Sequence, residues 1–181
     1  MNPPLINRVA NSSLEVINLE NYFPSTSLAH FDIKDYLFRE LLLREKDFRT
    51  ALKEHDWTQY EGKTLLIFCS SDAIIPVWAY MLIVTYASPY AQDVFQGTET
   101  AYYQAAFTSR LASEDWSTYE NKPVIIKGCG EKPVPPAAYM ELTKLLQPIV
   151  KSIMYGEPCS CLLYTSPSPR DQRGSRMPSS A

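Results

Sequence analysis

Residues 55–63 read HDWTQYEGK, and residues 114–122, which lie 59 positions later, read EDWSTYENK. The similarity continues beyond these two stretches. The same shift pairs further identical residues: Ile67 with Ile126, Pro76 with Pro135, Ala79-Tyr80-Met81 with Ala138-Tyr139-Met140, Pro89 with Pro148 and Gly97 with Gly156. A match at one fixed spacing indicates two copies of a single supersecondary unit. We place these copies at about residues 55–97 and 114–156.

Each copy has the pattern strand, helix, strand. Residues 64–68 and 124–127 are short apolar runs of the kind that form buried strands. Pro76 and Pro135 stand where a helix is expected to begin, and apolar residues follow at helical spacing. Second strands are predicted at residues 94–95 and 152–155. Two strands joined through a helix predict a parallel crossover, so the fold class is α/β with two duplicated βαβ units.

The residues outside the copies extend this unit. Residues 14–19 alternate between apolar and polar side chains and predict an edge strand. A helical segment is expected within residues 33–55, and another over residues 100–113, capped by Thr98 or Thr100. We therefore expect residues 1–160 to form a single α/β domain with a mostly parallel sheet and an N-terminal strand and helix extension.

The last residues differ in composition from the rest of the chain. From Leu162 the chain is rich in Ser and Pro, and it reads LLYTSPSPRDQRGSRMPSSA. This string resembles a translated sequencing adapter, and such segments are set aside when a fold is inferred. We expect residues 161–181 to be a disordered, non-native tail that replaces the natural C-terminus.

Composition excludes several classes of protein. The chain has 181 residues, of which 45% are hydrophobic and 20% charged, and its formal net charge is −3. The apolar run at residues 74–87 is shorter than the roughly 20 residues that span a bilayer. A mildly acidic chain also lacks the basic footprint that nucleic acid requires. We expect a cytoplasmic protein with reduced thiols that binds neither membrane nor nucleic acid.

Three cysteines are the candidate site. Cys69 and Cys129 each stand where a strand gives way to the turn before a helix, and Cys159 follows the last strand of the second copy. Sites in parallel sheets form outside the carboxyl ends of strands, where a helix N-terminus stabilises a thiolate. These thiols could converge on one metal or cluster site, with Asp72 or Glu131 completing it. The alternative is that each cysteine is only a small apolar packing residue.

Other signals are weaker. The sequence contains no nucleophile-elbow, P-loop, dinucleotide-binding or zinc-protease motif. The favoured interpretation is therefore a protein that is not an enzyme. The acidic and basic residues interleaved between 32 and 47 are interpreted as a solvated ion-pair face. His55 is interpreted as a structural residue at the end of a helix, and the repeated Asp-Trp as an anchor for each first strand.

Several stretches resemble one known family. These are FDIKD at residues 31–35, REKDFR at 44–49, CSSDAIIPVWAYM at 69–81, KGC at 127–129 and SIMYGEPCS at 152–160. Together they are similar to the family called domain of unknown function 2480 (DUF2480), which is found in Bacteroidota. The resemblance covers about residues 7–160 and ends where the adapter-like segment begins.

The resemblance implies no established activity. It does imply a functional context, because genes of this family tend to lie beside those of the sulfur-mobilisation system that builds iron–sulfur clusters. We therefore expect an accessory protein of iron–sulfur cluster assembly or sulfur transfer, whose partners are assembly proteins. Its cofactor is unknown; an iron–sulfur cluster or Zn²⁺ would suit Cys69, Cys129 and Cys159. The alternatives are a non-catalytic protein-binding scaffold with structural cysteines, or an enzyme that uses one activated thiolate.

Overall fold

The computed structural model describes residues 14–128, 130–156 and 162–164, the last of these by backbone alone. Internal contacts divide the chain into two compact units. Unit 1 comprises Met1–Phe23 and Phe107–Ala181, and unit 2 comprises Pro24–Ala106. Unit 2 is therefore inserted in the chain between two parts of unit 1, and each unit is described by itself. No helix in the described ranges is both long enough and apolar enough to cross a membrane.

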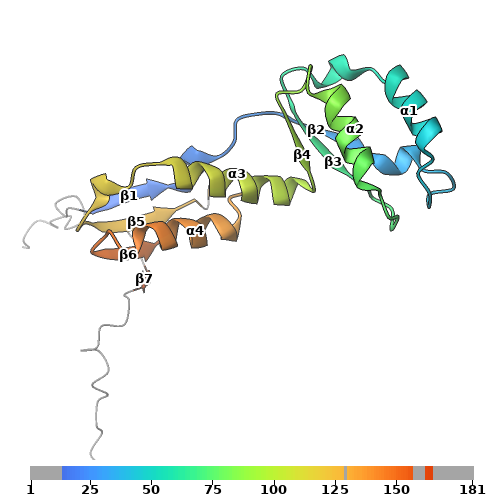
Figure 1. The fold of residues 1–181 in the computed structure, drawn as a ribbon. Coiled ribbons are helices and arrows are strands. Elements are labelled where there is room, and N and C mark those ends of the chain that lie inside the picture. The colour runs from blue at the N-terminus through green and yellow to red at the C-terminus, as the bar shows by residue number, and fades with distance from the viewer. Residues whose placement is uncertain (1–13, 129, 157–161, 165–181) are drawn as a thin grey trace, which may run out of the picture. The chain divides into compact units, whose positions relative to one another are not determined.

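Unit 2 is a three-stranded parallel sheet with two α-helices (Figure 1). The strand order is β2-β3-β4. Its elements in chain order are β2 (Leu28–Asp32), η2 (Ile33–Tyr36), α1 (Glu45–Glu54), η3 (Trp57–Tyr60), β3 (Thr64–Phe68), α2 (Val77–Ala87) and β4 (Asp93–Gln96). Leu65 and Ile67 alternate toward one face of β3, and there they share a core with Phe48 and Leu52 of α1 and Ile83 of α2.

Unit 1 repeats this arrangement. Its strand order is β1-β5-β6-β7, in which the first three strands are parallel and β7 is antiparallel to β6. Its elements are β1 (Glu15–Asn18), η1 (Leu19–Tyr22), the second part of α3, η4 (Ser117–Tyr119), β5 (Pro123–Lys127), α4 (Pro136–Leu146), β6 (Ser152–Tyr155) and β7 (Leu162–Tyr164). The helix α3 (Glu99–Ser113) begins in unit 2 and enters unit 1 at Phe107. Val124 and Ile126 of β5 share a core with Phe107 and Leu111 of α3 and with Leu142 of α4.

The duplication reaches further than the sequence match. The pairs β3 and β5, α2 and α4, and β4 and β6 each begin and end 59 positions apart. Phe48 and Leu52 of α1 correspond to Phe107 and Leu111 of α3, so the helix before each copy is part of the repeat. The strands β2 and β1, each followed by a 3₁₀ turn, complete the two repeats. Each unit is thus a full copy of the same fold.

The α/β class and both parallel βαβ copies are confirmed. The structure differs from the expectation in having two separate sheets, because β1 pairs with β5 while β2 pairs with β3. The predicted N-terminal strand and helix are therefore parts of the two repeats. Strand β2 was not predicted, and α1 is confined to the last part of residues 33–55. Thr98 caps α3, as one of the two expected alternatives, through a 3.3 Å bond from the Ala101 N–H.

The C-terminal segment also differs from the expectation in part. Residues 162–164 form β7, whose backbone pairs with β6 so that Met154 lies opposite Leu163. The short apolar run at this point can pair with the outer edge of β6, whereas the polar residues after it lack such a pattern. Residue 161 and residues 165–181 of the predicted tail lie outside the described residues.

Candidate functional site

The candidate site of unit 2 lies at the carboxyl ends of β2 and β3. Parallel pairing places Asp32, the last residue of β2, opposite Phe68, the last residue of β3. Cys69 follows immediately and begins the loop that leads to α2. This is the edge of a parallel sheet where ligands usually bind, because loops diverge there. The predicted position of Cys69 at the end of a strand is confirmed.

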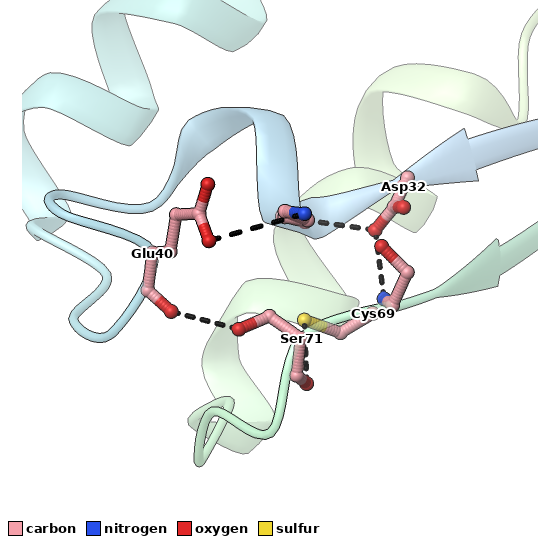
Figure 2. A network of polar contacts seen from close by, with 6 residues as sticks. Asp32, Glu40, Cys69 and Ser71 are labelled. Carbon is pink, nitrogen blue, oxygen red and sulfur yellow. Dashed lines mark hydrogen bonds and ion pairs between the residues drawn. The ribbon is translucent and has the colours of Figure 1, made fainter.

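A network of polar contacts fixes the loop after β3 (Figure 2). The Asp32 carboxylate accepts hydrogen bonds from the Lys34 N–H at 2.9 Å and the Ser70 N–H at 3.0 Å. On the other side of the loop, the Ser71 hydroxyl donates to the Glu40 carbonyl at 2.8 Å. The Lys34 ammonium lies 3.9 Å from the Glu40 carboxylate. Asp32 and Glu40 therefore hold the loop from two directions.

The charge of Asp32 is stabilised within this network. Burial of the carboxyl opposes ionisation, but hydrogen bonds from Ser70 and from the Lys34 N–H outweigh that effect and hold its pKa below the ordinary value of 3.8. The ionised carboxylate is the better acceptor for two N–H groups, since charge-assisted hydrogen bonds are stronger than neutral ones. Asp32 is thus an anion whose role is to position the loop that carries Cys69.

Cys69 is a free, partly buried thiol. Its sulfur donates to the Ser71 carbonyl at 3.4 Å, and its side chain packs against the apolar core of unit 2. Tyr80 of α2 is close by: burial raises the pKa of the Tyr80 hydroxyl, and the neighbouring Cys69 raises it further. The thiol therefore has one side against the core and one side toward the loop at the sheet edge.

The remaining predicted site residues are distributed between the two units. Asp72 is exposed in the same loop as Cys69, whereas Glu131 is exposed in unit 1, in the loop that follows β5. Cys129 and Cys159 lie outside the described residues. Within the described ranges, no three His, Cys, Asp or Glu side chains form a group that could hold a metal ion. The shared three-cysteine site accordingly stays a prediction.

The equivalent loop of unit 1 is built differently. The residue that corresponds to Cys69 is Gly128, and a Cβ added there would lie 2.7 Å from the Tyr139 hydroxyl and 3.1 Å from Leu19 Cβ. Tyr139, the counterpart of Tyr80, thus occupies the space that a side chain would need. The loop itself is held by Glu20, whose carboxylate accepts from the Gly130 N–H and whose carbonyl accepts from Lys132 at 3.1 Å. Only unit 2 has room for a thiol at this position.

Sequence reasoning missed the residues that position the loop, because it assigned Asp32 and Glu40 to a solvated face. A signal for Asp32 was present. Asn18 and Asp32 each end a strand, and each side chain accepts from the N–H two residues later. The stretches after them, LENY and IKDY, both begin with an aliphatic residue and end with Tyr. No comparable pattern marks Glu40, which contributes its backbone carbonyl from a loop.

His55 lies at the end of α1, and its contacts fit the structural role expected for it. Its Nδ1 lies 3.1 Å from the Tyr36 hydroxyl, and its Nε2 lies 2.9 Å from the Tyr60 hydroxyl. Burial lowers the pKa of His55 below 6.5, although Asp56 partly opposes this, and burial raises the pKa of Tyr60 to about 12. The neutral imidazole is thus the form that the folded unit favours.

A shallow cavity of about 270 Å³ lies in unit 2 beside Tyr36, the residue that contacts His55. Tyr36 and Phe48 form part of its apolar lining, and Asp35, Arg44 and Asp47 supply charges. The Arg44 guanidinium stacks 3.3 Å above the Phe38 ring and pairs with Asp47 at 3.8 Å. Arg44 and Asp47 are therefore already paired with each other, and none of the predicted site residues lines the cavity.

The fold and the loop after β3 define a duplicated α/β protein in which Cys69 places a thiol at the carboxyl edge of the parallel sheet of unit 2. The sequence profile of the family described as "Protein of unknown function (DUF2480)" matches residues 3–165. The chain therefore belongs to the DUF2480 family, and the resemblance found in its sequence is confirmed. No curated protein and no solved structure matches the chain.

Proposed function

We propose that the protein is a cytoplasmic accessory protein of sulfur transfer in iron–sulfur cluster assembly, and that Cys69, Cys129 and Cys159 are its working thiols. The observation that supports this most is the place of Cys69, a partly buried thiol at the carboxyl edge of the β2-β3-β4 sheet. The Asp32 and Glu40 contacts hold the loop that carries it. Its partners would be assembly proteins that deliver or accept sulfur.

The simplest chemistry for Cys69 is acceptance of sulfur from a persulfide. The Cys69 thiolate attacks the outer sulfur of a donor persulfide, and a new S–S bond forms on Cys69 while the donor S–S bond breaks. The donor leaves as a thiolate, so no external oxidant or reductant is needed. One thiol is sufficient for this step, and Cys69 supplies one that is partly exposed.

The second chemistry is ligation of a metal ion or cluster. Cysteine thiolates are the usual ligands of iron–sulfur clusters and of structural Zn²⁺. In this version Cys69, Cys129 and Cys159 would be ligands, and Asp72 or Glu131 would complete the set. The two chemistries are compatible, since the same thiols can carry sulfur or hold iron.

Mass spectrometry of the anaerobically purified protein separates these outcomes. After incubation with glutathione persulfide, we expect a peptide containing Cys69 to gain about 32 Da, the mass of one sulfur atom. The Cys69→Ser variant should lose this adduct, while Cys161→Ser, which alters a cysteine outside the proposed set, should keep it. Metal analysis after incubation with iron and sulfide, or with Zn²⁺, tests ligation. Protein that takes up neither sulfur nor stoichiometric metal would overturn the proposal.

A non-catalytic binding scaffold is the competing function, and one observation favours it. Cys69 packs against the core, and its sulfur already donates to the Ser71 carbonyl, as a purely structural cysteine would. In that case replacing Cys69, Cys129 and Cys159 by Ser would leave the set of proteins captured from a host lysate unchanged. A change in captured partners would instead support the thiol-based function.

A further inference from the structure

The helix α2 is apolar on two faces. Its inner face is buried in the core of unit 2 through Ala79, Ile83 and Ala87. Its outer face is also apolar. The exposed fractions there are 94% for Ile74, just before the helix, 74% for Val77, 67% for Met81 and 40% for Val84. The spacing of Val77, Met81 and Val84 places these three side chains along one face of the helix. Ile74 lies in the loop just before the helix. We call these four residues the α2 stripe. A helix at the surface of a folded unit normally presents polar residues on its outer side.

The outer face of α2 can be compared with that of its counterpart helix in unit 1. The helix α4 is the counterpart of α2, and Met140 is exposed to 67%, as Met81 is. Beyond this methionine the two outer faces differ: α4 has Thr143 and Lys144 where α2 has Val84 and Thr85. The same helix in the same fold therefore accepts polar and charged residues on this face. The apolar stripe on α2 is not a requirement of the fold.

The α2 stripe also lies in an uncharged stretch. Residues 73–92 contain no Asp, Glu, Lys or Arg. Among the described helices, the exposed faces of the others do carry charge, such as Lys46 on α1, Arg110 on α3 and Lys144 on α4. In a two-fold symmetric contact, residues near the symmetry axis lie close to their own copies, so a charge there would face a like charge. The α2 stripe avoids this repulsion.

We propose that the α2 stripe is an interface between two copies of this chain, in which α2 packs against α2 of a second copy. The stripe offers roughly 400–500 Å² of apolar surface, which is the size of the largest patch on a typical monomer. A stable complex uses about 800 Å² per partner, so the dimer should be weak and depend on concentration. A partner of opposite charge is disfavoured, because the stripe has no charge to complement.

Sedimentation velocity of the full chain, over about a hundredfold range of concentration, tests this proposal. We expect the wild type to shift from monomer toward dimer, and Met81→Lys to weaken the association at least tenfold. Met140→Lys, at the equivalent position of α4, is the matched control and should associate like the wild type. Circular dichroism of each variant checks that it is folded.

Mixing variants of opposite charge tests whether the α2 stripe of one copy contacts the α2 stripe of another. Met81→Lys and Met81→Glu should each be monomeric, and an equimolar mixture should recover dimer, because only a contact of the stripe with itself brings the two side chains together. A wild type that stays monomeric throughout, or a dimer unaffected by Met81→Lys, would overturn the proposal. So would two monomeric variants that do not recover association when mixed. None of these changes touches a cysteine, so the result is independent of the proposed function.

Discussion

The Ser70 N–H donates a 3.0 Å hydrogen bond to the Asp32 carboxylate, although the two residues are 38 positions apart. This contact exists because β2 and β3 are parallel and end side by side. Asp32 also caps the 3₁₀ turn that follows it, a role that Asn18 has in unit 1. Asp32 thus combines a local cap with a contact to the loop that carries Cys69.

Replacing Asp32 should therefore be more damaging than replacing Asn18. We expect Asp32→Ala to lower the free energy of unfolding by about 1–2 kcal/mol, since it removes both the cap and the Ser70 contact. Asn18→Ala removes a cap alone and should have the smaller effect. Urea denaturation of both variants measures the difference. Equal losses in the two would show that the Ser70 contact contributes nothing to stability.

The stabilisation by Asp32 should also depend on pH. The pKa of this carboxyl is lower in the folded protein than its ordinary value of 3.8, so the folded state binds fewer protons than the unfolded state. The contribution of its charge is present above that ordinary value and is lost as the pH falls through the folded pKa. We expect the stability difference between wild type and Asp32→Asn to shrink when the pH is lowered from about 6 to about 3. A difference that stays constant over this range would contradict the assignment.

Trp57 and Trp116 should have equivalent roles in the two units. The Trp57 indole N–H donates to the Leu52 carbonyl at 2.8 Å, and the Trp116 indole donates to the Leu111 carbonyl at 3.0 Å. Each bond satisfies a carbonyl near the end of the preceding helix. Trp57→Phe and Trp116→Phe should each lower the free energy of unfolding by about 1–3 kcal/mol, since a buried acceptor loses its donor. Trp78→Phe, at a partly exposed position, is the control in the same urea titrations and should have a smaller effect.

Local patterns in the sequence were sufficient for the duplicated elements. Apolar runs bounded by turn residues marked β3 and β5, and Pro76 and Pro135 marked the starts of α2 and α4. The helix α1 (Glu45–Glu54) lies within residues 33–55 as expected, but its first residue was not predictable. Arg39 and Glu40 adopt positive φ angles of 54° and 59°, which no helix accommodates, and residues other than glycine give no sequence signal for that conformation.

The candidate site was predictable only at the position of Cys69. A cysteine directly after an apolar β-rich run is visible in the sequence, and the structure places it there. The contacts of Asp32 depend on the pairing of β2 with β3, and strand order is not encoded in any local pattern. The division into two sheets was not predictable for the same reason, because β1 pairs with β5, more than 100 positions later in the chain, and β2 with β3.

Acidification should destabilise the protein through His55. The pKa of this imidazole is lowered below 6.5 in the folded protein, so the unfolded state binds more protons and stability rises with pH in this range. Its contribution is present above 6.5 and is lost as the pH falls below that value. We expect the free energy of unfolding to fall between about pH 7.5 and pH 5.5, followed by tryptophan fluorescence in urea.

Two variants assign this slope to His55. His55→Asn should flatten the pH dependence whatever its own effect on stability, because it removes the titrating group. His30→Asn changes the only other histidine in the sequence, which is exposed on β2, and should keep the slope of the wild type. A slope that survives in His55→Asn would place the titration on another residue.

Gly128 should not tolerate a side chain. Its added Cβ would lie 2.7 Å from the Tyr139 hydroxyl, a contact that requires something to shift. We expect Gly128→Ala to lower the free energy of unfolding by about 1–3 kcal/mol, as overpacking in a well-packed site does. Removing the hydroxyl should relieve part of this destabilisation, so the double variant Gly128→Ala, Tyr139→Phe should lose less free energy of unfolding than the sum of the two single changes.

Gly62→Ala is the contrasting control: its Cβ meets nothing within 4 Å, but its φ of +68° strains a side chain. That variant should be destabilised through the backbone alone, by about 1 kcal/mol, and should show no coupling to Tyr139→Phe. Equal coupling at both glycines, or none at Gly128, would show that the Tyr139 hydroxyl is not the obstacle at that position.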